Sequence, residues 1–415
     1  MWLTQAHHLR PDGTFGVADI GVEDGRIVEL APAGSQRGGI DCQGHVLLPG
    51  LVNGHYHSQA TLLRGQEAGL DLTEWFGDSP GGRLQARIGA WLDDPANRDA
   101  IATVIRHEYL TLLRQGVTFI ADSGVSEIDP SVLAGVGDEI GLRALPQAYD
   151  DDIEHLDPAR FTVHIESEED LTAEVLDRSV RYRDEFGPVF GLHCLETTWR
   201  RERALADWGA STVEVLDGRG LLTPRTVLFH GCEMTDRDVE LVARRGAAVM
   251  HCPVSNLALH GRIPPAVAWR RAGVTMGLGT DWGDTDMWGT VRTAWLLQQG
   301  DPDRAARPTP GEVLRMATRG GAVGYARDDL GEIAPGRTAD LVFLDASRLR
   351  PYAHRADVST LGFAVLNDGG ANLVRHVMVG GEFVLRDGEP TRVDATATAA
   401  RYHRIAADLV AQPSG

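Results

Sequence analysis

The chain contains no lysine: all 40 of its basic residues are arginine. This absence excludes a lysine that forms a Schiff base and the lysine of a nucleotide-binding P-loop. It also excludes a lysine carbamate as a bridge between two metal ions, because arginine cannot take these chemical roles. Several classes of enzyme are therefore removed before any motif is considered.

Cysteine is scarce as well. The four cysteines, Cys42, Cys194, Cys232 and Cys252, show no C-x-x-C spacing, and a chain of 415 residues does not need disulfides to be stable. Three of them lie within two residues of a histidine, so they are either thiolate metal ligands or small residues packed beside a site. A reduced, cytoplasmic location is expected.

Long apolar runs and excess positive charge are also missing. No run approaches the roughly 18 apolar residues of a membrane span, and the first residues carry no basic segment followed by an apolar one, so no secretory signal is expected. The net charge of −19 argues against nucleic acid or an anionic membrane as partner. A small-molecule substrate is expected instead.

Most of the chain alternates short apolar strands with helices. Residues 1 to about 48 read as short strands with tight turns, and from about 46 onward strand and helix repeat roughly eight times. The strands are expected at 46–57, 116–122, 142–148, 161–165, 189–193, 226–230, 247–251 and 274–281. This pattern is typical of an α/β fold of the (β/α)8 TIM-type barrel.

The helices and the chain ends complete the prediction. We expect Ser167 to cap a helix that runs to about 186 and Thr235 to cap a helix over 236–245. Strand patterns return at 339–344 and 376–384. The predicted domains are a small β-sandwich formed by 1–48 and 337–393, a barrel over 49–336, and a C-terminal helix and tail over 394–415.

Polar residues follow several of these strands. His55 and His57 are one residue apart, so they point to the same side of a strand end, and His193, His230 and Asp281 end or follow later strands. In such a barrel these ends open on one face, where active sites are built. Three imidazoles and one carboxylate suit Zn²⁺ or Fe²⁺ with a position open for water, although each residue alone could be structural.

Glu196 follows His193 by three residues, in the loop just past the strand. A divalent metal lowers the pKa of a water towards about 7. A carboxylate beside that water can take its proton and pass it to a leaving nitrogen. The alternative is a solvated acid in a loop.

Five segments of the sequence resemble the successive signatures of the amidohydrolase superfamily: PGLVNGHYHS, HCLETTWRRE, VLFHGCEMTD, MHCPVSNLALHGRIPP and GLGTDWGDTDMW. The tail GEIAPGRTADLVFLDA resembles the return of that fold into its β-sandwich. The most similar branch is the mononuclear one, which holds cytosine, guanine and S-adenosylhomocysteine/methylthioadenosine deaminases and triazine hydrolases. The absence of lysine agrees with this branch.

The resemblance implies a role for each site residue. One divalent metal, Zn²⁺ or Fe²⁺, would be bound by His55, His57, His193 and Asp281. Glu196 would shuttle the proton, His230 would hydrogen-bond to the hydroxide or the substrate, and Asp281 would also orient or deprotonate the water. A homodimer or homotetramer is implied by the same resemblance.

The chain departs from the branch in two places. Asn53-Gly54 stands where the branch has Asn-Thr, and only about fifty residues separate Gly141 from His193. The connection before Phe161 is therefore shortened, which puts the fourth strand in question. His164 falls where relatives carry a histidine that faces the substrate; a surface histidine is the alternative.

The substrate pocket is expected to be lined by residues near the strand ends. The candidates are Gln59 and the segment to Gln66, Trp75, Asp150 to Asp152, His164, Trp282, Asp284, Asp286 and Trp288. Tryptophans there would stack on a flat heterocycle, unless they only pack in the core. Acids and few arginines favour a neutral or cationic amino-heterocycle.

The predicted function is a deaminase that replaces the amino group of a purine, pyrimidine, pterin or triazine with hydroxide and releases ammonia. Alternatives on the same site release chloride or an alkylamine, or hydrolyse a cyclic amide, a formimino or a guanidino group. A remote alternative is a non-catalytic assembly protein that has kept the barrel.

Overall fold

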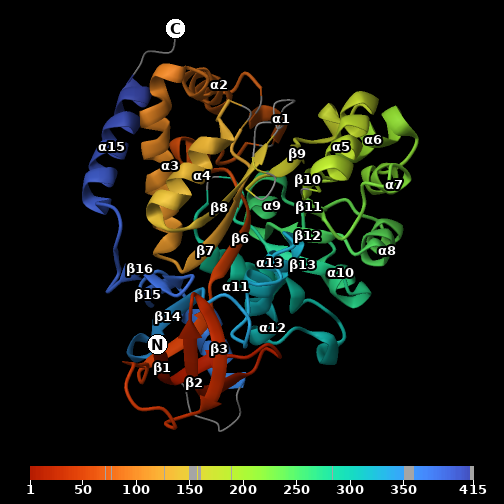
Figure 1. The fold of residues 1–415 in the computed structure, drawn as a ribbon. Coiled ribbons are helices and arrows are strands. Elements are labelled where there is room, and N and C mark those ends of the chain that lie inside the picture. The colour runs from red at the N-terminus through yellow and green to blue at the C-terminus, as the bar shows by residue number, and fades with distance from the viewer. Residues whose placement is uncertain are drawn as a thin grey trace.

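The chain folds into two sheets (Figure 1). The computed structural model describes residues 1–411 apart from 71, 76, 126, 149–156, 158–159, 188, 283 and 350–358. Within these residues, one sheet has eight parallel strands in the order of the sequence, and the other has nine strands from both ends of the chain. The predicted fold class, a (β/α)8 barrel with a small β-domain made by the two chain ends, is confirmed.

Each barrel strand pairs in parallel with its neighbours in sequence. Closure occurs where the Asp281 N–H donates to the His55 carbonyl at 2.9 Å. The strand expected at 161–165 pairs on both sides, so the shortened connection before Phe161 does not remove it. The barrel strands are β6 (Leu51–Tyr56), β7 (Val117–Asp122), β8 (Arg143–Ala148), β9 (Thr162–Ile165), β10 (Phe190–Cys194), β11 (Thr226–His230), β12 (Ala248–His251) and β13 (Thr275–Leu278).

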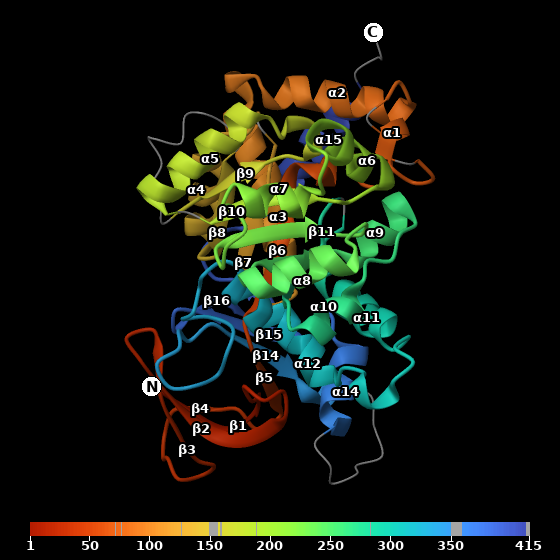
Figure 2. The same ribbon diagram turned by 90° about the vertical axis from the view of Figure 1, so that its right-hand side faces the viewer.

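Helices cover the outside of the barrel (Figures 1 and 2). Thr235 caps α8, as predicted, and the structure adds a capping box with Asp238. Among the described residues, no helix combines the length and the apolar character that a bilayer crossing requires. The helices are α1 (Leu72–Trp75), α2 (Pro80–Leu92), α3 (Arg98–Leu113), α4 (Pro130–Ile140), α5 (Ala173–Phe186), α6 (Thr198–Trp208), α7 (Thr212–Gly218), α8 (Asp236–Arg245), α9 (Pro253–His260), α10 (Ala266–Ala272), α11 (Met287–Gln298), α12 (Pro310–Arg315), α13 (Gly321–Gly324), α14 (Ser359–Asp368) and α15 (Ala395–Ala411).

The predicted cap at Ser167 is wrong. Residues Glu168–Asp170 form a separate 3-10 turn, η4, and α5 begins only at Ala173. The true cap is Thr172, whose Oγ1 accepts from the Val175 N–H at 3.2 Å. Both residues are good cap types with acids after them, so the local pattern alone does not separate them. The two candidates are separated only by the contacts that Glu168 makes with distant residues of the chain.

The small domain joins the two chain ends in one continuous sheet below the barrel (Figure 2). Strand β14 lies antiparallel to β5 and connects the halves, and buried residues from both halves share one core. The domain limits at 48, 336 and 393 stay predictions. The strands are β1 (Trp2–Leu9), β2 (Phe15–Glu23), β3 (Arg26–Pro32), β4 (Ile40–Asp41), β5 (His45–Pro49), β14 (Leu341–Asp345), β15 (Val374–Val379), β16 (Glu382–Arg386) and β17 (Glu389–Pro390).

Candidate metal centre

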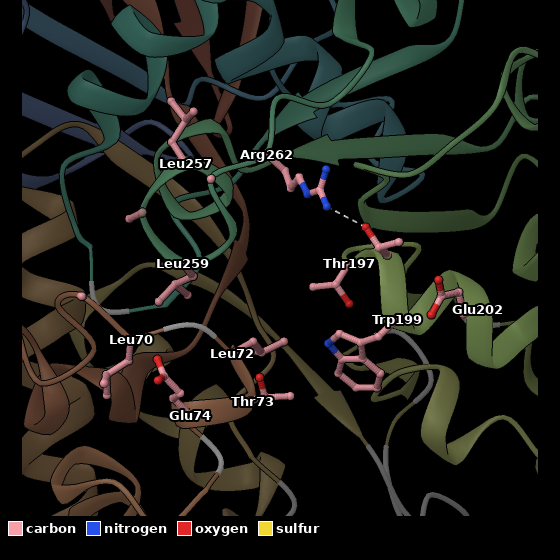
Figure 3. A pocket seen from close by; sticks show the side chains of 14 residues that line it. Leu70, Leu72, Thr73, Glu74, Thr197, Trp199, Glu202, Leu257, Leu259 and Arg262 are labelled. Carbon is pink, nitrogen blue, oxygen red and sulfur yellow. Dashed lines mark hydrogen bonds between the residues drawn. The ribbon is translucent and has the colours of Figure 1, made fainter.

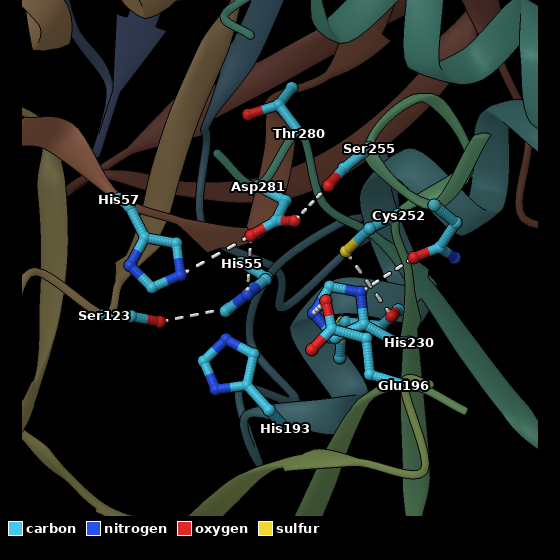
Figure 4. Close-up of polar contacts among 12 residues, drawn as sticks. His55, His57, Ser123, His193, Glu196, His230, Cys252, Ser255, Thr280 and Asp281 are labelled. Atoms are coloured by element: carbon cyan, nitrogen blue, oxygen red, sulfur yellow. Dashed lines mark hydrogen bonds and ion pairs between the residues drawn. The ribbon is translucent and has the colours of Figure 1, made fainter. Parts of the chain in front are cut away.

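Four histidines and one aspartate meet at the carboxyl ends of the barrel strands (Figure 4). His55 and His57 come from the end of β6, His193 from β10 and His230 from β11, while Asp281 follows β13. None of the five is more than 5% exposed. The structure therefore brings together the residues that the sequence placed at four separate strand ends.

The donor atoms of this group lie close enough to share one ion. One ligand atom each of His55, His193, His230 and Asp281 lies within 4.8 Å of the others. His55 Nε2 is 3.0 Å and His57 Nε2 is 3.5 Å from Asp281 Oδ1, so His57 borders the same centre. Imidazoles with one carboxylate are a donor set for a divalent transition metal, and the residues present fit it. His230 is as close to the centre as the expected ligands.

Each histidine is fixed from behind at Nδ1. Two of the partners are backbone carbonyl oxygens, which only accept, so His57 and His193 carry their proton on Nδ1 and leave the Nε2 lone pair for the centre. The four pairs are His55 with Ser123 Oγ at 3.0 Å, His57 with Gly124 O at 2.9 Å, His193 with Glu166 O at 2.6 Å and His230 with Asn256 Oδ1 at 2.8 Å. No local pattern in the sequence pointed to these partners.

Asp281 is held by a direct hydrogen bond, and the residue before it is anchored to β6. The Ser255 hydroxyl donates to its Oδ2. On the strand side, Asn53 Nδ2 donates to Thr280 Oγ1 at 2.8 Å, and the Thr280 N–H donates back to Asn53 Oδ1 at 3.0 Å. Asp281 and His230 both have a positive φ, +62° and +66°, which costs energy in residues with a side chain. The surrounding contacts hold this strained backbone in place.

The charge state of the centre suits metal binding. Burial lowers the pKa of His55 to about 3 and that of His193 well below its ordinary value. Burial opposes ionisation of Asp281, but the neighbouring histidines, His230 first, outweigh it and hold the pKa of this carboxyl well below its ordinary value. Neutral imidazoles and an ionised carboxylate are the forms that bind a metal.

The cysteines near the histidines are not part of this group. Burial raises the pKa of the Cys194, Cys232 and Cys252 thiols, so they stay protonated, and in the described chain no cysteine joins a cluster of possible metal ligands. The alternative that they are small residues packed beside the site is the one the structure favours. All four cysteines are free thiols.

Glu196 is buried and paired. It is 4% exposed, its Oε1 lies 3.6 Å from His230 Nε2, and its Oε2 accepts from Arg200 Nη1. Arg200, in the first turn of α6, is also buried and contacts Glu169 at 3.3 Å. Glu196 is therefore no solvated acid: it faces the metal centre with its other oxygen held by an arginine.

The loop that carries Glu196 is fixed by Glu168, which lies within the helix that was expected to follow Ser167. Glu168 Oε1 accepts from the Leu195 N–H at 2.7 Å and from the Thr212 hydroxyl at 2.8 Å. Leu195 has a positive φ of +51°. These contacts explain why 168–170 forms a separate turn and not the start of α5.

Loss of the buried Glu196–Arg200 ion pair is expected to lower the free energy of unfolding strongly. Arg200→Met leaves the Glu196 carboxylate buried without its cation, and breaking such a pair costs about 3–5 kcal/mol. The double variant Arg200→Met/Glu196→Gln removes that charge and is expected to recover most of the loss. Urea unfolding of the metal-loaded protein measures both.

The same helix offers a matched control. Arg203 pairs with Asp207, but its side chain is 52% exposed, and an exposed pair contributes about 0–1 kcal/mol. Arg203→Met should therefore change the free energy of unfolding little. If Arg200→Met and Arg203→Met lowered the free energy of unfolding equally, the buried Glu196–Arg200 pair would stabilise the protein no more than an exposed pair does.

Three of the expected pocket residues lie beside the centre, and a fourth, Trp75, lies against one of them. The Trp282 ring lies 5.3 Å from the His57 ring and 6.0 Å from Trp75. The His164 ring lies 5.3 Å from His193, and His164 is buried, not on the surface. Gln59 is buried and donates through Nε2 to the Gly124 carbonyl at 3.0 Å.

The other pocket candidates lie elsewhere. Trp288 is fully buried and donates its indole N–H at 2.9 Å to the carbonyl of Gln115, which precedes β7 at the opposite end of the barrel, so its expected role at the pocket is wrong. Asp284 accepts from the Asp286 N–H, and Asp286 caps α11, so both shape a turn. Asp150 to Asp152 fall outside the described residues.

A cavity of about 660 Å³ opens at the mouth of the barrel (Figure 3). It lies between the loops after β6, β10 and β12, and its lining includes Leu72, Thr197, Trp199, Leu259 and Arg262. Thr197 directly follows Glu196 in the chain. The cavity thus lies next to the loop that carries Glu196.

Known proteins are similar to this chain in sequence and in fold. Residues 46–384 match the amidohydrolase family. A 5-methylthioadenosine/S-adenosylhomocysteine deaminase of Natronomonas pharaonis is 32% identical over 100% of this chain and 99% of its own length, and an 8-oxoguanine deaminase of Pseudomonas aeruginosa is 30% identical over 96% of each. The crystal structure of a zinc-bound adenosine deaminase from Xanthomonas campestris has a TM-score of 0.86 and 26% identity, over 99% of this chain and 98% of that one.

Proposed function

Because the chain belongs to the amidohydrolase family, we propose that it is a metal-dependent hydrolase that releases ammonia from an amino-substituted N-heterocycle. The observation that carries this proposal is the position of Glu196, which is buried and lies 3.6 Å from His230 beside a group of metal-type donors. A metal centre with a buried carboxylate next to it is what hydrolysis at an aromatic C–NH₂ carbon requires.

The proposed metal is one Zn²⁺ per chain, with Fe²⁺ as the alternative. The proposed ligands are His55, His57, His193 and Asp281. When bound, such an ion lowers the pKa of a water towards about 7 and makes hydroxide available at neutral pH. The neutral imidazoles and the ionised carboxylate support this assignment.

The proton path runs through Glu196. Its Oε1 takes one proton of the attacking water and delivers it to the exocyclic nitrogen, which leaves as ammonia when the C–N bond breaks. The ring carbon gains a carbonyl oxygen, and the second proton of the water ends on the neighbouring ring nitrogen. Arg200 holds the other carboxylate oxygen, so the side chain keeps one orientation during the transfer. His230 Nε2 faces the same space and forms a hydrogen bond at the attacked carbon, and Asp281 orients the water.

We propose an aminopurine, free or as a nucleoside, as the substrate. This choice is supported by the relatives that bear the names of adenosine-type and 8-oxoguanine deaminases. The Trp282 ring lies beside His57, and the Trp75 ring lies beside Trp282; aromatic faces suit a flat ring. Pyrimidines, pterins and triazines are the alternative ring classes. The alternative reactions are the release of an alkylamine or chloride and the opening of a cyclic amide.

A substrate panel tests this proposal. Zinc-reconstituted protein is expected to release ammonia from at least one aminopurine, measured in a coupled assay that also includes pyrimidines, pterins and triazines. The Glu196→Gln protein serves as the matched blank. If no compound of the panel yields ammonia, the deaminase proposal fails, and chloride, alkylamine or ring-opened products from the same incubations would identify the alternative reaction.

The setting of the enzyme belongs to the same proposal. We place it in the cytoplasm, as a homodimer or homotetramer that acts on a small molecule without nucleic acid or membrane as partner. The four free thiols and the net charge of −19 support this setting.

A further inference from the structure

A chain of hydrogen bonds joins four buried side chains inside the barrel, behind the metal centre. His55 Nδ1 lies 3.0 Å from Ser123 Oγ, and the Ser123 hydroxyl bonds with Gln147 Oε1. Gln147 Nε2 lies 3.5 Å from the hydroxyl oxygen of Tyr325, and this hydroxyl donates at 2.6 Å to the Gly54 carbonyl. The chain therefore links a proposed metal ligand to a tyrosine that lies three hydrogen bonds away.

The members of the chain come from adjacent barrel strands. Ser123 directly follows β7, Gln147 lies in β8, and Tyr325 directly follows α13 and packs among apolar residues of the barrel interior. The Tyr325 ring lies 5.7 Å from the ring of Phe119 in β7. None of the four side-chain members is more than 3% exposed, so each polar group depends on its neighbour in the chain for a hydrogen-bond partner.

The Gly54 carbonyl sets the direction of every bond, because a carbonyl only accepts. A phenol keeps its proton at neutral pH, and the single proton of Tyr325 goes to this carbonyl, so the Tyr325 oxygen must accept from Gln147 Nε2. The reverse orientation of the amide would place two acceptors against each other. Gln147 Oε1 then takes the one hydroxyl proton of Ser123, and Ser123 Oγ can only accept from His55. The proton of the neutral imidazole is therefore on Nδ1.

This order leaves His55 Nε2 as a bare lone pair. The atom lies 3.0 Å from Asp281 Oδ1 without a hydrogen bond between them. Two acceptors at this distance repel each other, and a divalent cation bound by both relieves the repulsion. With the proton on Nε2, His55 could instead donate to Asp281, and the two ligand atoms would satisfy each other. The direction of the chain favours the form that binds a cation.

We propose that Tyr325 and Gln147, acting through Ser123, are positioning residues that hold the proton of His55 on Nδ1 and so prepare its Nε2 for a divalent metal. The proposal rests on the proposed metal centre and extends it to a residue beyond the direct partners of the ligands. Direct partners of this kind change metal affinity by about 10–100-fold. Tyr325 is expected to act on the same affinity from one shell further out.

Zinc titration of the metal-free protein, followed by calorimetry, tests the chain. Ser123→Ala should lower zinc affinity about 10–100-fold and Tyr325→Phe about tenfold. The double variant should lose no more than Ser123→Ala alone, because Tyr325 acts only through Ser123. Tyr402→Phe is the matched control: its hydroxyl bonds with Thr61 at 2.9 Å, outside the chain, and its loss should change zinc affinity less than about twofold. Losses that add in the double variant, or an unchanged affinity in Tyr325→Phe, would overturn the proposal.

Nitrogen NMR of the metal-free protein reads the proton position directly. With ¹⁵N-labelled histidine, His55 of the wild type should carry its proton on Nδ1, and Tyr325→Phe should move part of the population to the Nε2–H form; a His55→Asn spectrum assigns the signals. This measurement requires neither metal nor turnover. If the panel yields no ammonia while the tautomer and the zinc affinity respond as expected, deamination fails and the chain stands. A wild-type His55 with its proton on Nε2 would exclude the chain whatever the ammonia assay shows.

Discussion

The Glu196→Gln variant is expected to lose about 10²–10⁴-fold in kcat, the usual contribution of a positioned general acid–base group. Glutamine keeps the shape of the side chain, and its amide can still bond with neighbouring groups, but it cannot carry the proton from the water to the leaving nitrogen. Metal content should stay at the wild-type level, because Glu196 is not among the proposed ligands. Steady-state ammonia release together with metal analysis measures both effects.

Glu233 provides a matched control for this variant. It follows His230 by three residues, as Glu196 follows His193, but it contacts Thr198 and Arg262 and not the metal group. Glu233→Gln should keep kcat within about threefold of wild type. Near-normal turnover in Glu196→Gln would mean that another group moves the proton, and the role proposed for Glu196 would have to be withdrawn.

The Asp281→Asn variant is expected to lose its metal and, with it, all measurable turnover. The carboxylate is the one anion in the proposed ligand set, and even the loss of an outer hydrogen bond to a ligand costs about 10–100-fold in metal affinity. Asparagine tolerates the positive φ at this position, so the backbone should remain as it is. Metal titration monitored by calorimetry gives the affinity directly.

Ser255→Ala provides a milder change for comparison, because Ser255 is not a proposed ligand but donates a hydrogen bond to the ligand Asp281. Its metal affinity should fall by about tenfold, less than in Asp281→Asn. An Asp281→Asn protein that binds one metal as tightly as wild type would contradict the ligand assignment. A wild-type protein that takes up no metal at all would instead favour the non-catalytic alternative.

The strands and the residues at their ends were predictable from the sequence. Alternation of apolar strands with helices fixes a parallel barrel, and in a barrel the carboxyl ends of all strands meet at one face. His55, His193 and His230 could therefore be placed together without knowing any distance. The cap at Thr235 could also be predicted from neighbouring residues, because the capping box joins two residues three positions apart.

Contacts between distant segments were not predictable in this way. Ser167 looked like a cap because the competing contacts of Glu168, to Leu195 and Thr212, come from other elements. Trp288 looked like a pocket residue because it follows Asp281 by only seven positions, but the connection carries it to the opposite end of the barrel. Neither distinction is visible in a local pattern.

The residues that hold the histidines and Glu196 in place could not be predicted from a local pattern either. Asn256, which fixes His230, is 26 residues away from it, and Ser123 is 68 residues from His55. Arg200 lies only four residues from Glu196, yet an ion pair at this spacing is normally exposed and contributes little. Only its burial, which depends on the packing of α6 against η4, reveals that it holds the catalytic carboxylate in the proposed mechanism.

The most direct test of the account is ammonia release from the purine panel by one preparation, measured before and after zinc is restored to the metal-free protein. We predict no release without metal and, with one zinc per chain, steady release from an aminopurine. Equal release with and without zinc, or none with one zinc bound, would contradict the account.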